Sequence, residues 1–230
     1  MKLRLLVAVG AVGCALSVRA DSGQFGGVGI SCYVQDGLLA LYDGIENAGA
    51  GQHDGEAKTW ADLSGNNRTG TLSAYAKFTE DSLDMFATTP PSKDGKGQWG
   101  VATTTDLSGI GTIESYSRPT GGPSTARTLW AGYPTYTTLP TAAMRVSNND
   151  TAPALGANSD CKPSWGTMSF NDFWHVGYVS TGSDKWQPFV NGALVANQST
   201  PQVPTTTGLS FGGFDRYNRT LYGNLYAVRI

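Results

Sequence analysis

The stretch that most constrains the fold runs from Phe170 to Val195, with the sequence FNDFWHVGYVSTGSDKWQPFVNGALV. It contains two apolar runs (173–179 and 186–190), separated by a polar turn and followed by the pair Asn191-Gly192. Asn-Gly between two β-prone runs strongly indicates a two-residue hairpin, because both central residues of a type I′ turn adopt positive φ. The stretch therefore predicts an antiparallel meander of three strands, which disfavours an α/β fold.

Most of the remaining chain repeats this pattern of short β-prone runs between breakers. The chain has 30 Gly and 11 Pro in 230 residues, and no segment sustains a 3.6-residue apolar period. Residues 148–163 read as one long polar loop. Together these features predict an all-β fold, a two-sheet antiparallel jelly-roll β-sandwich with very little helix. Further strands are expected at 37–42, 77–86 (with a turn at Glu80-Asp81), 111–117, 128–131, 142–146, 208–212 and 221–230.

Composition and charge argue against a nucleic-acid partner. Charged residues make up 15% of the chain, and the formal net charge is −2. Because a nucleic-acid-binding surface needs clustered basic residues, neither DNA nor RNA is an expected partner.

The N-terminus has the pattern of an export signal. Lys2 and Arg4 precede an apolar run, and small residues at Val18 and Ala20 predict cleavage after Ala20. The run is too short for a transmembrane helix, and no later segment is long enough. We expect a secreted, extracellular or periplasmic protein. The alternative is a lipoprotein acylated at Cys14.

Removal of residues 1–20 would leave two cysteines, Cys32 and Cys161. An even number of cysteines in an exported chain favours one disulfide between them, and the alternative is two separately buried thiols. Residues 21–36 would then form a short leader with a first strand, and residues 37–230 would form a single sandwich domain.

Five motifs, in a fixed order, carry a family resemblance. They are GLLALYDGIEN, TWADLSGNNRTGTL, FWHVGYV, FVNGALV and LYGNLYAVRI, between Gly37 and Ile230. In this order they resemble the laminin-G-like branch of the concanavalin A-like lectin-glucanase jelly-roll family, of the secreted bacterial type. The resemblance implies two curved antiparallel sheets in which the first and last strands pair.

Catalytic motifs are not evident in the sequence. Glycoside hydrolysis needs a pair of carboxyl groups across the scissile bond. Glu80, Asp81 and Asp84 have the wrong spacing for one strand face, and Glu114 has no carboxylate two or four residues away. His53 is expected to be a solvated loop residue, and His175 a sheet residue whose ring bonds a neighbouring strand. The chain is therefore predicted not to be an enzyme, with glycoside hydrolase the third hypothesis.

Three oxygen-bearing residues suggest a calcium site. Calcium prefers carboxylate, amide and carbonyl oxygens. Asp43 closes a predicted strand, and Asp62 and Asn66 lie in the tight loop DLSGN. Relatives in the resembled family bind calcium at loop ends, which the resemblance extends to these residues. The alternative is that Asp62 and Asn66 cap their own turn.

Aromatic side chains in loops suggest carbohydrate binding, because sugar rings pack their apolar faces on exposed aromatic rings. Trp60 and Trp174 are expected in the core. We therefore predict a secreted, non-catalytic module that binds a polysaccharide or glycan at its loops or concave face; the alternative is a protein-binding or structural module of an extracellular assembly. The candidate ligand-binding residues in or beside loops are Trp99, Tyr133, Tyr136, Trp165 and Tyr217.

Overall fold

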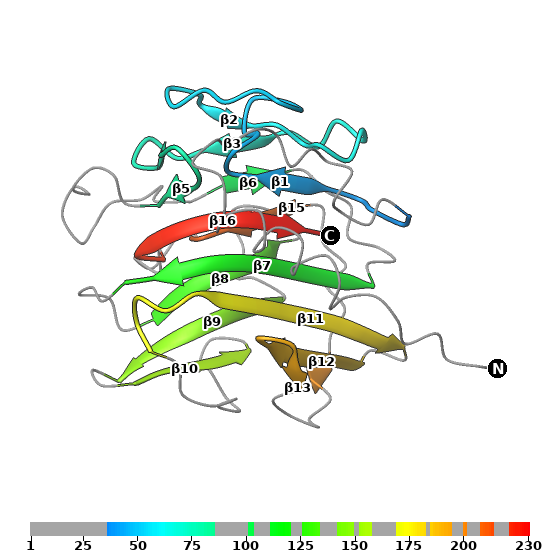
Figure 1. Cartoon of the computed structure of the whole chain (residues 1–230). Helices are drawn as coiled ribbons and strands as arrows, with labels where there is room; N and C mark the ends of the chain where they lie inside the picture. The colour runs from blue at the N-terminus through cyan, green and yellow to red at the C-terminus, as the bar shows by residue number, and fades with distance from the viewer. Residues whose placement is uncertain are drawn as a thin grey trace.

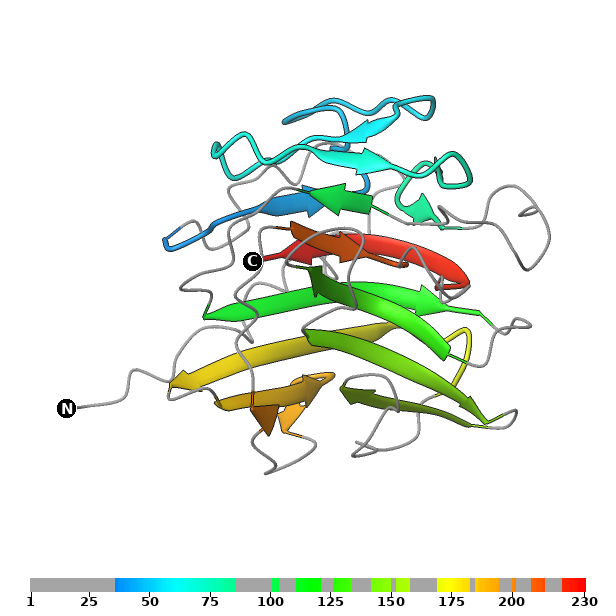
Figure 2. The same cartoon turned by 180° about the vertical axis from the view of Figure 1, so that it is seen from behind.

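The computed structural model shows two antiparallel β-sheets stacked face to face (Figures 1 and 2). No helix long and apolar enough to cross a membrane occurs in the part of the chain that is described. The structure describes residues 36–85, 101–103, 111–120, 126–133, 142–149, 152–157, 169–182, 185–194, 200–201, 208–213 and 221–230.

The first sheet has nine strands and lies in front in Figure 1. Its main path runs β13-β12-β11-β7-β16-β5-β4, while β1 also pairs with β16 and β14 with β12. The strands are β1 (Leu41–Asp43), β4 (Lys77–Phe78), β5 (Leu83–Asp84), β7 (Thr112–Pro119), β11 (Trp174–Gly182), β12 (Lys185–Val190), β13 (Ala193–Leu194), β14 (Thr200–Pro201) and β16 (Gly223–Arg229).

The second sheet has seven strands and faces the viewer in Figure 2. Its order is β10-β9-β8-β15-β6-β3-β2. The strands are β2 (Thr59–Trp60), β3 (Gly70–Leu72), β6 (Val101–Thr103), β8 (Ala126–Tyr133), β9 (Ala142–Asn149), β10 (Ala152–Ala157) and β15 (Gly208–Phe211). The predicted all-β antiparallel sandwich is confirmed.

One hydrophobic core fills the space between the two sheets. Burying a large apolar side chain contributes about 1.5–3 kcal/mol, so a few large rings from both sheets supply much of the stabilisation. Trp60 and Trp174, which were predicted to be core residues, are 0% and 1% exposed. Among the side chains that the structure describes, the largest fully buried ones are Trp60, Trp130, Trp174, Tyr42, Phe211, Leu41 and Leu83.

The predicted meander is present as β11, β12 and β13. Asn191 has φ 49° and Gly192 has φ 80°, so both turn residues adopt the positive φ that a type I′ turn requires. The Asn191 side chain also accepts a hydrogen bond from the backbone N–H of His175, at 3.0 Å, which ties the turn to β11.

The pairing of first and last strands, implied by the family resemblance, is also found. Leu41 of β1 lies opposite Arg229 of β16 in an antiparallel ladder. The expected strand at 37–42 is shifted to Leu41–Asp43, and just before it the backbone N–H groups of Leu39 and Ala40 donate to the carbonyl of Ile230.

The expected loop at 148–163 was wrong in its middle part. Residues Ala152–Ala157 form β10, which pairs with β9 from Ala152 opposite Asn149 to Ala157 opposite Met144. Small residues carry little strand propensity of their own. Here the ladder with β9 supplies the backbone hydrogen bonds that hold the segment extended.

Gly223 fixes the junction between β16 and β7. Its φ is +126°, and a Cβ at this position would lie 2.2 Å from the carbonyl oxygen of Arg118 on β7. Only glycine fits here, because both the φ value and the approach of the neighbouring backbone exclude a side chain.

Substituting Gly223 by Ala should lower the free energy of unfolding by about 3 kcal/mol, since positive-φ strain of roughly 1–2 kcal/mol adds to a backbone clash. Gly192→Ala is the matched control, because Gly192 also has positive φ (+80°) but open space around its Cβ position. It should lose only about 1 kcal/mol. Urea unfolding measures both values, and equal losses would contradict the proposed clash.

Candidate functional site

The candidate site lies on the face of the nine-stranded sheet that points away from the core. Because side chains alternate along a strand, residues of β7 divide between the two faces. Ile113, Ser115 and Ser117 are buried and point toward the core. Glu114 and Tyr116 point the other way, as does the exposed Arg118.

Strand register places residues from β11 and β16 beside them. His175 of β11 and Ala227 of β16 both lie opposite Tyr116. The ladder between β7 and β16 is irregular between Leu225 and Ala227, which leaves Tyr226 in a bulge. Bulges redirect side chains, and this one brings the Tyr226 ring against Tyr116.

Three aromatic rings on this face are in mutual contact. The rings of Tyr116 and Phe173 stack with centroids 5.3 Å apart and planes 9° from parallel. Tyr226 is tilted against both, at 5.6 Å from Tyr116 and 5.3 Å from Phe173. Phe173 keeps 42% of its surface exposed. We call these three residues the aromatic platform.

Arg118 borders the aromatic platform. Its guanidinium carbon lies 5.5 Å from the centroid of the Phe173 ring, a cation–π distance. Its Nε donates a hydrogen bond of 2.7 Å to the carbonyl of Asn171. The side chain is therefore held in one orientation although it is exposed.

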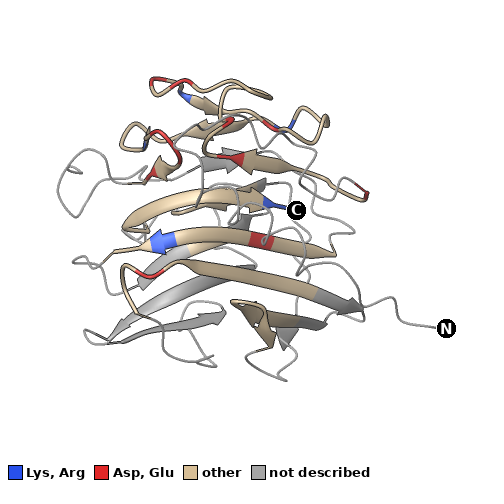
Figure 3. Ribbon diagram, viewed as in Figure 1, with Lys and Arg blue, Asp and Glu red and all other residues tan. Residues whose placement is uncertain are grey.

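An ion pair lies beside the aromatic platform. Arg229 Nη2 is 2.5 Å from Glu114 Oε2, and the two side chains are only 18% and 8% exposed. In Figure 3, acidic and basic segments are sparse on the front sheet and more frequent in the loops around β1 to β5. Glu114, which the sequence left without a carboxylate partner, thus has a cationic one from β16.

His175 lies next to this ion pair. Burial lowers the pKa of the imidazole below its usual 6.5, Glu114 raises it in part, and Arg229 lowers it further. Its ring Nε2 is buried and has no hydrogen-bond partner among the described residues, so the expected ring hydrogen bond is not made by this nitrogen.

The loop-aromatic prediction is largely outside the described residues. Trp99, Tyr136, Trp165 and Tyr217 all lie there, as do both cysteines of the predicted disulfide, Cys32 and Cys161. Tyr133 ends β8 in the seven-stranded sheet, where it lies opposite Gly208 of the neighbouring strand β15. These assignments stay predictions.

The side chains of the predicted calcium ligands form hydrogen bonds with backbone groups. Asp62 Oδ1 accepts the N–H groups of Leu41 (3.0 Å) and Ser64 (2.9 Å), and its Oδ2 accepts that of Arg68 (2.9 Å). The Asn66 amide donates to the carbonyls of Leu38 and Leu39, each at 3.0 Å. This loop therefore binds the chain that leads into β1.

Asp43, the third predicted ligand, accepts the N–H groups of Ile45 and Glu46 at 2.7 and 3.2 Å. Within the described ranges, no group of three or more His, Cys, Asp or Glu side chains lies close enough to hold a metal ion. A calcium site at Asp43, Asp62 and Asn66 stays a prediction.

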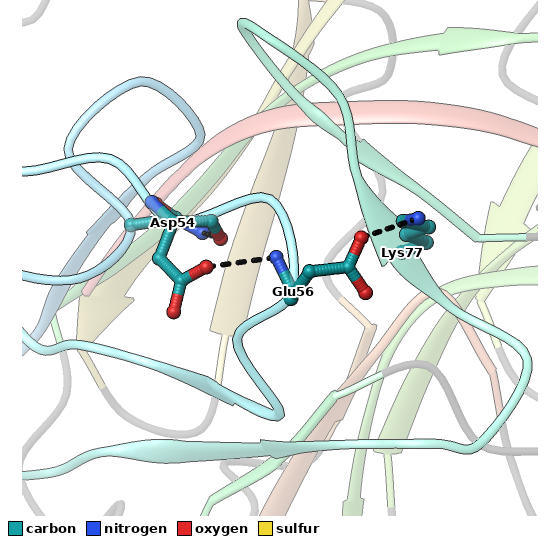
Figure 4. Close-up of polar contacts among 4 residues, drawn as sticks. Asp54, Glu56 and Lys77 are labelled. Carbon is teal, nitrogen blue, oxygen red and sulfur yellow. Dashed lines mark hydrogen bonds and ion pairs between the residues drawn. The ribbon is translucent and has the colours of Figure 1, made fainter.

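The loop around His53 is a surface network. His53 is exposed, as predicted, and its Nδ1 lies 3.1 Å from the carbonyl of Ile45. Figure 4 shows Asp54 accepting the N–H of Glu56 (2.9 Å) and Glu56 paired with Lys77 (2.7 Å). The hydrogen bond and charge of Lys77 lower the pKa of Glu56. Such an exposed pair contributes little to stability.

The sequence did not single out the aromatic platform. Tyr116, Phe173 and Tyr226 are each unremarkable in an alternating β segment, and they come from three distant parts of the chain. The available indication was the alternation at 111–117, which separates Glu114 and Tyr116 from Ile113 and Ser115. It does not say which strands adjoin β7.

Comparison with known proteins shows similarity at the level of fold. No family model matches the chain, and no curated protein sequence matches it. The structure is similar to Trypanosoma rangeli sialidase in complex with sialic acid, with a TM-score of 0.60 and 14% identity over 84% of this chain and 30% of the sialidase. The chain thus spans less than a third of that protein.

Two further solved structures show similar coverage of this chain. The same sialidase with 2,3-difluorosialic acid, a covalent intermediate, gives a TM-score of 0.59 at 14% identity over 84% of this chain and 30% of that one. Domain 4 of AbnA, an extracellular arabinanase from Geobacillus stearothermophilus in complex with arabinotriose, gives 0.49 at 13% identity over 84% and 90%. At these identities the sialidase matches show the β-sandwich fold alone.

Replacing Asp62 by Ala should lower the free energy of unfolding by about 3 kcal/mol, because three backbone N–H groups lose a charged acceptor. Asp54→Ala is the matched control. Asp54 is exposed and its carboxylate accepts one N–H, so its loss should be about 0.5 kcal/mol. Chemical denaturation measures both, and a loss for Asp62→Ala as small as the control's would contradict the structural role.

The free energy of unfolding should decrease as the pH is lowered, because of the protonation of His175. In the unfolded state the imidazole takes up a proton below its ordinary pKa of 6.5. In the folded state its pKa is lower, so it stays neutral to a lower pH. The unfolded state therefore binds more protons as the pH drops, and the folded state loses stability. Between about pH 7 and about pH 5, the wild type should lose more unfolding free energy than His175→Gln. Parallel pH dependences in the two proteins would refute this.

Proposed function

We propose that this protein is a secreted, non-catalytic binding module that recognises carbohydrate on the outward face of the nine-stranded sheet. The observation that carries the proposal is the aromatic platform of Tyr116, Phe173 and Tyr226, with Phe173 42% exposed. Sugar rings present apolar C–H surfaces that pack on exposed aromatic groups, while nearby polar groups fix their orientation.

The arrangement of the platform favours ligand binding because its rings are already ordered. Each ring contacts the other two, so little side-chain entropy remains to be lost when a ligand packs on them. All three also come from strands or strand ends rather than from long loops, and sites on rigid elements hold their geometry best. Arg118 supplies a fixed polar group at the border.

The finer assignments belong to the same proposal. The five ordered sequence motifs support a laminin-G-like, concanavalin A-like sandwich, and the N-terminal pattern supports export with cleavage after Ala20. The loop aromatics Trp99, Tyr136, Trp165 and Tyr217 would extend or replace the platform if they gather at the same end of the sandwich. Localisation would follow from the N-terminal sequence of the mature protein.

A protein-binding or structural role is the second candidate. Aromatic residues and arginine are also enriched in protein interfaces. Phe173 is an exposed aromatic residue, and the neighbouring Arg118 is an exposed arginine. This alternative predicts a protein partner whose recovery in pull-downs does not change after glycosidase treatment.

The proposal is tested by substituting Phe173 and measuring sugar binding. Affinity gel electrophoresis against plant, algal and mucin polysaccharides identifies a bound polymer, and Phe173→Ala should weaken its retention about tenfold, the effect of removing one aromatic contact. Leu194→Ala is the matched control, because Leu194 is 44% exposed and lies on β13, away from the platform. It should bind as the wild type does.

Two results would contradict the proposal. The absence of binding to every polysaccharide, with and without calcium, would remove the carbohydrate function. Binding that Phe173→Ala leaves unchanged, while the variant unfolds at the wild-type temperature, would keep the function but place the site elsewhere, with the loop aromatics as the next candidates.

A further inference from the structure

The environment of Arg118 indicates which kind of carbohydrate the proposed site binds. We infer, on the basis of the proposed function, that the site takes sugars that carry a carboxylate group, and that Arg118 determines this specificity by binding the carboxylate. The inference rests on three features of this side chain: its fixed orientation, its unused donors and its uncompensated charge.

The orientation of Arg118 is fixed at two points. The Nε–H donates to the Asn171 carbonyl at 2.7 Å, and the guanidinium lies over the Phe173 ring at 5.5 Å. A flexible surface arginine would lose considerable rotamer freedom on binding an anion. Arg118 has already lost this freedom in the folded protein.

The donors that remain are those that bind anions best. Within the described part of the chain, the Nη amino groups of Arg118 have no hydrogen-bond or ion-pair partner, and the residue is exposed. A guanidinium presents its N–H groups in a planar fork that matches the two oxygens of a carboxylate. Because Nε is occupied by Asn171, the two Nη groups are the ones available to a ligand.

Arg118 differs in this respect from the other arginine of the same sheet face. Arg229 is 2.5 Å from Glu114 and is largely buried, so its charge is neutralised within the protein. Besides Glu114, two carboxylates lie on neighbouring segments: Asp84, two strands away in register on β5, and Asp172, between Asn171 and Phe173. Neither forms an ion pair with Arg118 among the described residues. A ligand carboxylate would therefore meet an unneutralised cation at the border of the aromatic platform.

A sugar acid matches both halves of this arrangement. Its ring offers C–H groups to the platform, and its carboxylate reaches a cation held next to the exposed Phe173. Uronic acids and sialic acids both combine a sugar ring with a carboxylate. The structure therefore favours sugar acids as a class, and experiment distinguishes uronic acids from sialic acids.

Two probe pairs test the inference, each differing in the carboxylate. The first is polygalacturonate against its methyl-esterified form, and the second is sialyllactose against its carboxyl methyl ester. The wild type should bind at least one acidic probe about tenfold or more tighter than its neutral counterpart, as expected for a charge-assisted bidentate contact. The pair that shows the preference identifies the source as uronate or sialate.

Substitutions then assign the preference to Arg118. Arg118→Gln should abolish the acidic preference, measured as the ratio of the affinities for the acidic and the neutral probe, and Arg118→Lys, which keeps the charge without the fork, should retain only part of it. Lys77→Gln is the matched control: Lys77 lies on β4 and is paired with Glu56, so its loss should not change the preference. The preference of the wild type should also weaken with added salt.

The results separate this inference from the function on which it rests. Equal binding of acidic and neutral probes, or a preference that survives Arg118→Gln, overturns the inference while carbohydrate binding stands. If the protein binds neutral polysaccharides and no acidic ones, the inference is likewise overturned and carbohydrate binding stands. Failure to bind any probe or any polysaccharide overturns both.

Discussion

The outward face of the nine-stranded sheet depends on the antiparallel register of β7, β11 and β16. Because side chains alternate with a period of two, a shift of one residue in any of these strands would exchange its two faces. The observed register places Glu114 opposite Gly177 and Arg229, and Tyr116 opposite His175 and Ala227. The same ladders that bury Trp174 and Val228 therefore also gather the platform and the ion pair.

This face is less polar than the solvent side of an antiparallel sheet usually is. Its centre holds three aromatic rings, a histidine whose Nε2 lacks a partner among the described residues, and a largely buried ion pair. A buried ion pair is weak evidence for stability, because desolvation offsets most of the attraction. The Glu114–Arg229 pair has a clearer electrostatic consequence: it removes two charges from the face and leaves the Arg118 charge exposed.

The composition of the Asp62 loop and its contacts in the folded chain indicate different roles for its side chains. The residues of DLSGN fit either a turn that caps itself or a hard-cation site, since both use carboxylate and amide oxygens. In the folded chain these groups bind backbone more than 20 residues away, at Leu38, Leu39 and Leu41. The loop thus holds in place the segment that pairs with the C-terminal strand, a role that turn composition alone does not indicate.

The sequence by itself determined what depends on neighbouring residues: the Asn191-Gly192 turn, the strands at β7, β11 and β16, the scarcity of helix and the burial of Trp60 and Trp174. These follow from local φ preferences and from period-two alternation, which act over a few residues. Only the tertiary structure decided that β10 is a strand, that Glu114 pairs with Arg229, and that Tyr116, Phe173 and Tyr226 meet. Strand β10 is held by its ladder with the neighbouring strand β9, whereas the ion pair and the platform contacts join residues more than 50 positions apart in the chain. Strand order and register across a sheet are set by packing of the whole core rather than by any local pattern.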